Sequence, residues 1–252
     1  MEDARRPVTV VTGASRGIGA AIALRLAAAG HDVAVNYRSD RDAAGDVVAA
    51  VTATGARAVA VRGDVTDEAA VEELFATAQD RLGPVTGLVN NAGATLHVGD
   101  LADTPASVVR EVVELNLVAV LLCARRAAQL MSVRRGGPGG VIVSLSSAAA
   151  TLGSPHEYVH YAAAKAGVDA MTVGLAKELA EDGIRVNAVA AGTVRTRIHA
   201  DAGDPGRPDR VAPRIPLRRP GTADEIAAAV AWLMGAEATY ATGAVLRVAG
   251  GL

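Results

Sequence analysis

Two overlapping motifs in residues 154–165, which read SPHEYVHYAAAK, could support two different chemistries. His156-Glu157-Tyr158-Val159-His160 fits H-E-x-x-H, in which two histidines one helical turn apart bind zinc and the glutamate activates water. Tyr161-Ala162-Ala163-Ala164-Lys165 fits Y-x-x-x-K, which places a lysine ammonium on the helical face of a tyrosine. The first motif predicts hydrolysis at a metal ion. The second predicts proton transfer during a redox reaction, because a nearby cation favours the phenolate.

The zinc interpretation has little support elsewhere in the chain. Pro155 comes directly before His156, so the helix is expected to begin there, with the first histidine on an irregular turn. Glu178 is available downstream as a third ligand, but no further motif accompanies it. Cys123 is the only cysteine, which excludes a thiolate metal cluster and a disulfide framework. We therefore favour the tyrosine–lysine motif and expect no metal.

Short β-branched runs alternate with helical patterns along the chain, and these elements must position the motif. Strands are expected at residues 8–11, 32–37, 58–61, 87–90, 141–145, 185–189 and 244–248. Helices are expected at 18–26, 41–53, 67–82 (with Thr66 as the N-cap), 105–132, 158–181 and 222–234. Such alternation predicts an α/β fold with a parallel sheet and helices on both faces.

Length and composition limit the class of protein. The 252 residues, half of them apolar, suit one domain over residues 1–252. A net charge of −2 without a basic stripe argues against nucleic acid as a partner. The longest early apolar run, residues 8–11, is too short for a signal peptide or a membrane span, so we expect a soluble cytoplasmic protein. The Pro-, Gly- and Arg-rich stretch 199–220 is interpreted as a mobile active-site loop.

A glycine-rich turn lies between the first expected strand and the first expected helix. It reads Thr12-Gly13-Ala14-Ser15-Arg16-Gly17-Ile18-Gly19. Gly13 permits a tight turn, Gly17 lets a pyrophosphate approach the backbone, and Gly19 lets the helix and strand pack closely. The free N–H groups and partial positive charge of the helix N-terminus then face the phosphates. This context predicts a nucleotide-binding site.

Several motifs in a fixed order now make the chain resemble the short-chain dehydrogenase/reductase family. They are the spacing T-G-x-x-x-G-x-G, Asp64, Asn90-Asn91-Ala92-Gly93, Asn116, Ser146-Ser147, Tyr161 and Lys165. The resemblance implies a single Rossmann-type, doubly wound sheet of about seven strands and an NAD(P)-dependent oxidoreductase acting on a carbonyl or secondary alcohol. It is strongest toward the branch that contains oxoacyl-carrier-protein reductases and glucose dehydrogenases. It also implies a homotetramer.

The same resemblance assigns roles to individual residues. Tyr161 is the general acid/base, Lys165 supports it and holds the nicotinamide ribose, Ser147 binds the substrate carbonyl, and Asn116 holds a water that relays protons. The cofactor-binding set is Gly13, Ser15, Arg16, Gly17, Ile18, Gly19, Arg38, Asp64, Val65, Asn90, Ala92, Gly93, Tyr161, Lys165 and Thr193. Substrate contacts are expected from residues 94–98, 148–160 and 194–219.

The end of the second strand favours NADP(H), with NAD(H) possible. NAD-preferring enzymes place an acidic residue there for the ribose 2′-OH. Here Asn36-Tyr37-Arg38-Ser39 offers no carboxylate before Asp40. Arg16 and Arg38 would instead both lie near a 2′-phosphate, which guanidinium groups suit.

Two departures from the family pattern leave alternatives open. The interval from Ser147 to Tyr161 is one residue longer than usual, so counting back the usual interval reaches Ala148, and Ser146 competes with Ser147. Ala191 stands where the family usually has proline, which is expected to loosen the backbone leading to Thr193. A different class of function also stays open, that of a catalytically inactive dinucleotide-binding sensor or scaffold. The substrate cannot be identified from the fold.

Overall fold

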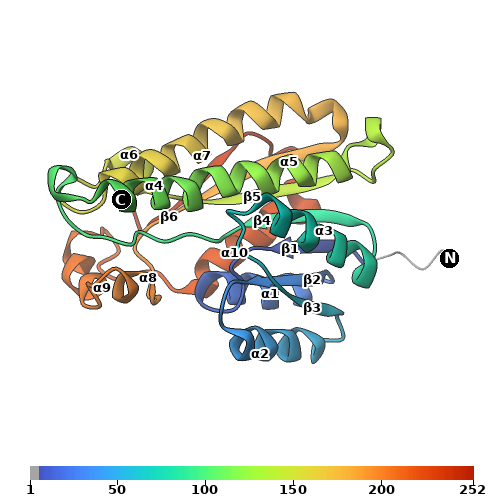
Figure 1. Cartoon of the computed structure of the whole chain (residues 1–252), viewed down its shortest axis with the longest axis horizontal. Helices are drawn as coiled ribbons and strands as arrows, with labels where there is room; N and C mark the ends of the chain where they lie inside the picture. The colour runs from blue at the N-terminus through green and yellow to red at the C-terminus, as the bar shows by residue number, and fades with distance from the viewer. Residues whose placement is uncertain (1–5) are drawn as a thin grey trace.

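Seven parallel strands form one sheet in the computed structural model, which describes residues 6–252 (Figure 1). The strands are β1 (Val8–Val11), β2 (Asp32–Tyr37), β3 (Ala58–Arg62), β4 (Val85–Asn90), β5 (Gly140–Ser147), β6 (Ile184–Ala191) and β7 (Val245–Val248). The helices are α1 (Gly17–Ala28), α2 (Arg41–Thr52), α3 (Glu68–Leu82), α4 (Ala106–Val113), α5 (Ala119–Met131), α6 (Ala149–Leu152), α7 (Val159–Glu178), α8 (Ile198–Asp201), α9 (Arg207–Val211) and α10 (Ala223–Met234). The predicted parallel α/β sheet of seven strands is confirmed.

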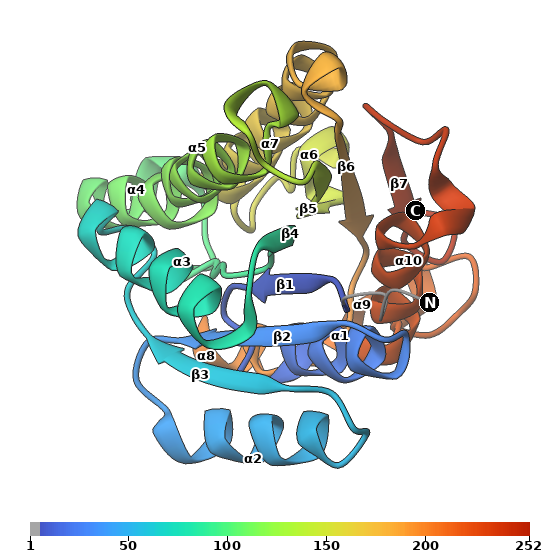
Figure 2. The same ribbon diagram turned by 90° about the vertical axis from the view of Figure 1, so that its right-hand side faces the viewer.

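Helices cover both faces of this sheet, and each layer has its own core. On one face α1, α2 and α10 bury side chains such as Ile22, Val47 and Leu233 against the strands. On the other face α3, α5 and α7 (Figure 2) do so with side chains that include the fully buried Phe75. Because both faces are covered, every residue of β1 and β2 is buried. This explains why the strands appear in the sequence as continuous apolar runs.

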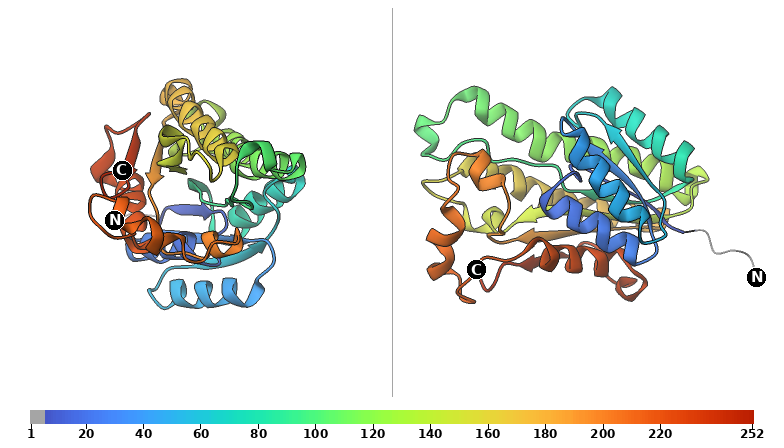
Figure 3. Two further views of the ribbon diagram at one scale, coloured as in Figure 1. Left: turned by 90° about the vertical axis from the view of Figure 1, so that its left-hand side faces the viewer. Right: turned by 90° about the horizontal axis from the view of Figure 1, so that it is seen from below.

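The order of the strands places a crevice at the carboxyl edge of the sheet. The order is β3-β2-β1-β4-β5-β6-β7, so β1 pairs with β2 on one side and with β4 on the other. The chain therefore continues from β1 to one side of the sheet, through β2 and β3, and then to the other side, through β4. The loop after β1 and the loop after β4 turn away from each other and leave a crevice between them. Ligands of open α/β sheets bind at such a switch point. The segment with α8 and α9 lies at this end of the molecule (Figure 3).

Two helical regions differ from the sequence-based expectation. The helical pattern at 105–132 contains a π-helical turn, Glu114–Val118, between α4 and α5. The N-cap of α3 is Asp67, which accepts from Ala69 N, so the prediction of Thr66 is wrong. Thr66 instead donates its hydroxyl to Asp64. Because the Thr66 hydroxyl is engaged with Asp64 in the preceding turn, it does not cap α3.

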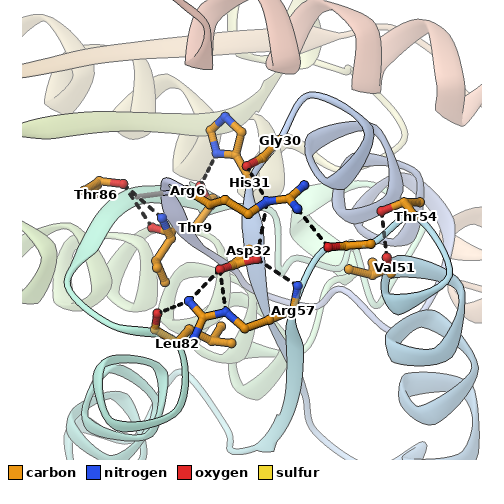
Figure 4. A network of polar contacts seen from close by, with 12 residues as sticks. Arg6, Thr9, Gly30, His31, Asp32, Val51, Thr54, Arg57, Leu82 and Thr86 are labelled. Carbon is orange, nitrogen blue, oxygen red and sulfur yellow. Dashed lines mark hydrogen bonds and ion pairs between the residues drawn. The ribbon is translucent and has the colours of Figure 1, made fainter. Parts of the chain in front are cut away.

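The amino ends of the strands are fastened by a polar network at the edge opposite the crevice (Figure 4). Asp32, at the start of β2, is fully buried and accepts from both the backbone N–H and the guanidinium of Arg57, just before β3. Arg57 also donates to the Leu82 carbonyl at the end of α3. Beside it, His31 contacts the Thr9 hydroxyl of β1 at 2.9 Å. One buried carboxylate thus links β2 to the segments leading into β3 and β4.

None of the helices within residues 6–252 combines the length and apolarity needed to cross a membrane.

Candidate active site

The glycine-rich turn joins β1 to α1 and forms one wall of a cleft at the crevice. Gly17 lies in the left-handed region, with a φ of 57°, and lines the cleft at the first residue of α1. A Cβ on Gly19 would lie 2.5 Å from both the Gly13 carbonyl and the Asn91 amide nitrogen. Glycine at 19 therefore lets the helix pack directly on the turn. The cleft keeps its bare backbone beside the N-terminus of α1, which fits a pyrophosphate.

Most predicted cofactor-binding residues line this cleft. The structure brings together Gly13, Ser15, Arg16, Gly17, Ile18, Arg38, Asp64, Val65, Ala92 and Gly93. Five residues, Ile18, Asn91, Gly93, Thr196 and Ile198, also line an adjoining pocket, so the two pockets form one continuous depression. Tyr161, Lys165 and Thr193 from the same prediction line the adjoining pocket. Gly19 lies behind the cleft wall.

Asn90 is not among the lining residues, and its neighbour takes that place. The Asn90 side chain is buried and donates to the Ser144 hydroxyl of β5 at 3.2 Å. Asn91 lines both pockets, and its amide donates to the backbone carbonyls of Thr12 and Gly13. Side chains alternate between the two faces of a strand. Neighbouring asparagines at a strand end therefore face different surroundings, and the strand register decides which of the two faces the cleft.

Two arginines and one acidic cap determine the charge at the β2 end of the cleft. Arg16 pairs with Asp201 of α8 at 3.1 Å, and Arg38 lies 3.9 Å from Asp64. The Arg38 side chain is 69% exposed, so it is free to meet a ligand from solvent. Asp40, the nearest carboxylate after β2, accepts from Ala43 N as the N-cap of α2. The end of β2 therefore presents two guanidinium groups to the cleft, and such groups suit an anionic ligand.

Tyr161, Ser147 and Lys165 converge in the adjoining pocket. Lys165 lies one turn after Tyr161 on α7, with its Nζ 5.6 Å from the centre of the phenol ring. The ammonium donates to the Leu145 carbonyl of β5 at 2.8 Å, which fixes its position. Both side chains are more than nine-tenths buried. A phenol, a hydroxyl and an ammonium thus face one small space.

Burial controls the protonation of this group. It raises the pKa of Tyr161 to about 12, against a hydrogen bond with Ser147 and the positive charge of Arg207, both of which lower it. It lowers the pKa of Lys165 to about 8, against the negative charge of Asp169. Tyr161 therefore holds its proton at neutral pH and is placed to donate it. Lys165 still carries its charge there and favours any phenolate that forms.

Asn116 lies in the π-helical turn, behind the pocket. Its amide nitrogen donates to the carbonyls of Ala94 and Val112, at 2.8 and 2.9 Å. Its Oδ1 is buried without a hydrogen-bond partner among residues 6–252. A Cβ on Gly93 would meet this oxygen at 2.7 Å and Lys165 Nζ at 3.6 Å. The free acceptor thus faces the same small volume as the ammonium, which π-helical turns often provide at functional sites.

The two neighbouring serines point to different partners. Ser147 lines the pocket with Tyr161, and its hydroxyl lowers the pKa of that phenol, whereas Ser146 is buried and donates to the Lys165 carbonyl at 3.4 Å. Ala148 has no side chain that could replace either. The turn after α6, which lies between Ser147 and Tyr161, contains Gly153, Ser154 and His156 with positive φ. The longer interval therefore leaves Ser147 beside the phenol.

Thr193 and the segment after it close the pocket from the other side. Ala191 ends β6 within the ladder, opposite Val248, and its carbonyl accepts from Ala148 N at 2.8 Å. The backbone before Thr193 is thus held without proline. Thr193 accepts a hydrogen bond from Arg207 of α9 at 3.3 Å. The segment at 199–220 carries α8 and α9, and the sequence did not single out its Arg207.

The zinc motif has no matching geometry. His156 precedes α7, is 85% exposed at its side chain and contacts Asp100 at 2.8 Å. His160 lies in α7 and is buried with its Nε2 3.3 Å from the Thr95 carbonyl. The two rings therefore do not share one helical face. Across residues 6–252, His, Cys, Asp and Glu side chains form no group of three placed to hold a metal ion.

Comparison of the sequence with known proteins gives a consistent result. Residues 13–252 match the family model described as enoyl-(acyl carrier protein) reductase. The chain is 43% identical over 244 residues to uncharacterized oxidoreductase YgfF of Escherichia coli, which covers 97% of this chain and 99% of that protein. It is 40% identical over 253 residues to 3beta-hydroxysteroid dehydrogenase 1 of Eggerthella lenta, covering 100% of this chain and 95% of that protein.

A solved structure extends the likeness to the fold. The short-chain dehydrogenase of Burkholderia cenocepacia in complex with NADP superposes with a TM-score of 0.88 at 37% sequence identity. The match covers 98% of this chain and 97% of that one.

Proposed function

Because the chain belongs to the short-chain dehydrogenase/reductase family, we propose that it is an NADP(H)-dependent oxidoreductase in which Tyr161 is the general acid/base. NAD(P)-dependent oxidoreductase chemistry follows from the family. The preference for NADP(H), the role of Tyr161 and the class of substrate, a small carbonyl compound or secondary alcohol, are the proposal. The single observation that carries it is the convergence of Tyr161, Ser147 and Lys165 in a pocket continuous with the cleft at the glycine-rich turn.

The chain's own groups supply the proton chemistry of carbonyl reduction. The Ser147 hydroxyl and the Tyr161 phenol donate to the substrate oxygen and stabilise the negative charge that develops on it. The bound nicotinamide supplies the hydride that reduces the carbonyl carbon. Tyr161 gives its proton to that oxygen, so one hydride and one proton together convert the carbonyl to an alcohol. Lys165, held by the Leu145 carbonyl, stabilises the resulting phenolate.

Reprotonation of Tyr161 requires a path away from the pocket. Asn116 Oδ1 is a buried acceptor without a protein partner in the described chain, and it faces the Gly93 position that also neighbours Lys165. We assign this oxygen to holding a water that passes protons to Lys165. The assignment explains why a buried acceptor is tolerated there, since a bridging water satisfies it.

The cofactor preference rests on the cleft beside β2. Arg16 and Arg38 line the cleft, and Asp40 is engaged in capping α2. A 2′-phosphate would therefore meet two guanidinium groups, whereas a 2′-hydroxyl would lack its usual carboxylate. The Gly13–Gly17 backbone would hold the pyrophosphate, and Thr193 the carboxamide.

Steady-state turnover tests the function directly. Oxidation of NADPH and of NADH is measured over a panel of ketones, β-ketoesters and sugars, together with NADPH affinity by fluorescence. The proposal expects NADPH-dependent turnover of at least one carbonyl compound. Tight NADPH binding without turnover on the whole panel would instead indicate a dinucleotide-binding sensor or scaffold.

We also propose a homotetramer. Exposed apolar side chains on α5 and α7, Leu121 and Val173, and the edge position of β7 support it. Light scattering at micromolar concentration measures the mass. A monomer would contradict the proposal.

A further inference from the structure

Arg207 of α9 makes an unusually complete set of contacts for a residue on a surface segment. Its Nε and Nη2 donate to the two carboxylate oxygens of Glu157, at 3.1 and 2.6 Å. Its Nη1 donates to the Thr193 hydroxyl at 3.3 Å. The guanidinium side chain is only 10% exposed, and that of Glu157 is 21% exposed. This two-pronged pair fastens the segment with α8 and α9 to the turn just before α7.

The same guanidinium reaches the proton donor through an aromatic neighbour. Arg207 lies over the ring of Tyr158, 5.1 Å from its centre. Tyr158 in turn packs edge-on against Tyr161, with ring centres 5.5 Å apart and planes at 89°. All three side chains line the pocket that holds Ser147. The position of α9 is therefore coupled to the phenol by continuous packing.

We propose that the Glu157–Arg207 pair is a clasp that docks the segment carrying α8 and α9 and places a second cation beside Tyr161. The proposal rests on Tyr161 being the proton donor. Arg207 is a positioning residue: its charge stabilises the developing phenolate in addition to that of Lys165, and its side chain closes the pocket next to Thr193. An undocked segment removes both effects, so full proton transfer requires the clasp to be closed.

The surrounding charges favour this role over an ordinary surface ion pair. The positive charge of Arg207 lowers the pKa of the Tyr161 phenol. Arg210, 3.8 Å from Glu157, is itself paired with Asp204 at the rim. Other ion pairs of the segment, such as Arg195–Asp209, are more than half exposed on both sides. Exposed pairs of that kind contribute little.

Replacing Glu157 tests whether the ion pair docks the segment with α8 and α9, without removing the Arg207 charge. Glu157→Gln keeps Arg207 but loses the carboxylate, and Asp209→Asn is the matched control that breaks only the exposed pair. Trypsin cleaves after arginine, and both variants keep every arginine of residues 195–219. The rate of cleavage in this segment therefore measures how often the segment undocks. We expect Glu157→Gln to be cleaved in this segment several times faster than the wild type, and Asp209→Asn to be cleaved at the wild-type rate. Equal cleavage of the two variants would overturn the docking part of the proposal.

Arg207→Ala and Arg207→Lys test the cation. Arg207→Ala removes a cation near the phenol, which raises the pKa of Tyr161 and makes it a weaker proton donor. We expect kcat for carbonyl reduction to fall about tenfold, the change that about one unit in that pKa would produce. Arg207→Lys, which keeps the charge, should recover most of this loss. Millimolar guanidinium chloride should partly restore Arg207→Ala, whereas equal urea or sodium chloride should not. Unchanged kcat in Arg207→Ala, or equal activity of the Lys and Ala variants without guanidinium rescue, would contradict the proposal.

The two readouts also distinguish this proposal from the function on which it rests. The trypsin assay needs no turnover. If the wild type turns over no substrate while Glu157→Gln is still cleaved faster, the proposed function fails and the docking contact stands. If turnover depends on Tyr161 but not on Arg207, the clasp fails alone.

Discussion

At the scale of single residues, position within the strand matters as much as residue type. Asn90 and Asn91 are the same residue in one motif, yet one binds Ser144 in the sheet and the other lines both pockets. Ser146 and Ser147 divide in the same way. The sequence indicates that a polar pair is present at each strand end. Which member faces the cleft depends on strand register, which motif matching does not supply.

The cofactor preference can be tested at one such residue. Arg38→Asp replaces a guanidinium in the cleft with a carboxylate, which repels a 2′-phosphate and accepts from a 2′-hydroxyl. We expect the ratio of kcat/KM for NADPH to that for NADH to fall at least about tenfold. Arg81→Asp, on the exposed side of α3 and outside the cleft lining, is the control and should leave the ratio unchanged. An unchanged ratio in Arg38→Asp would remove Arg38 from the cofactor site.

At the scale of elements, helix and strand periods predict the framework but not its local interruptions. The pattern at 105–132 gives helix throughout, and only the structure reveals the π-helical turn that turns Asn116 toward Gly93. Likewise, residues 153–158 form a turn with three positive φ angles just before α7. Both departures lie beside Tyr161. Local strain at functional sites is set by tertiary contacts, which a single sequence does not display.

The glycine-rich turn gives an element-scale prediction with a matched control. In Gly19→Ala the new Cβ would lie 2.5 Å from the Gly13 carbonyl, so the turn must move. We expect NADPH to bind at least about tenfold more weakly, because the phosphate-facing backbone shifts with the turn. A Cβ at Gly45, on the exposed side of α2, meets nothing within 4 Å. Gly45→Ala should therefore stabilise folding by about 0.5–1 kcal/mol and leave NADPH affinity unchanged.

Fluorescence titration and urea unfolding provide the two measurements. Wild-type NADPH affinity in a folded Gly19→Ala protein would show that close packing at this position is not required for the cofactor site.

At the scale of the whole molecule, the carboxyl ends of the strands form the binding cleft, whereas the amino ends contribute to stability. The carboxyl edge carries the cleft, and the amino edge is tied together around the buried Asp32 (Figure 4). The layered fold was predictable because strand and helix periods alternate without interruption and both sheet faces must be covered. The Asp32–Arg57 network was not, because it joins residues 25 apart whose types are common on surfaces.

Removing the network should affect stability and spare the chemistry. Asp32→Asn loses the charge that accepts from Arg57, so we expect the free energy of unfolding to fall by about 2 kcal/mol. Arg125→Gln, which breaks an exposed pair with Glu68, should cost less than about 0.5 kcal/mol. The kcat of both variants should match the wild type at a temperature where they are folded. Equal stability of the two variants in urea unfolding would contradict the structural role of Asp32.

The most direct test of the central claim is the kcat for carbonyl reduction by Tyr161→Phe, with Tyr240→Phe as the control on a fully exposed tyrosine. Loss of the phenol proton should lower kcat about 10²–10⁴-fold while NADPH affinity and the unfolding midpoint stay near the wild-type values. Tyr240→Phe should retain full activity. Wild-type kcat in Tyr161→Phe would contradict the account, because no other residue has been assigned to deliver that proton.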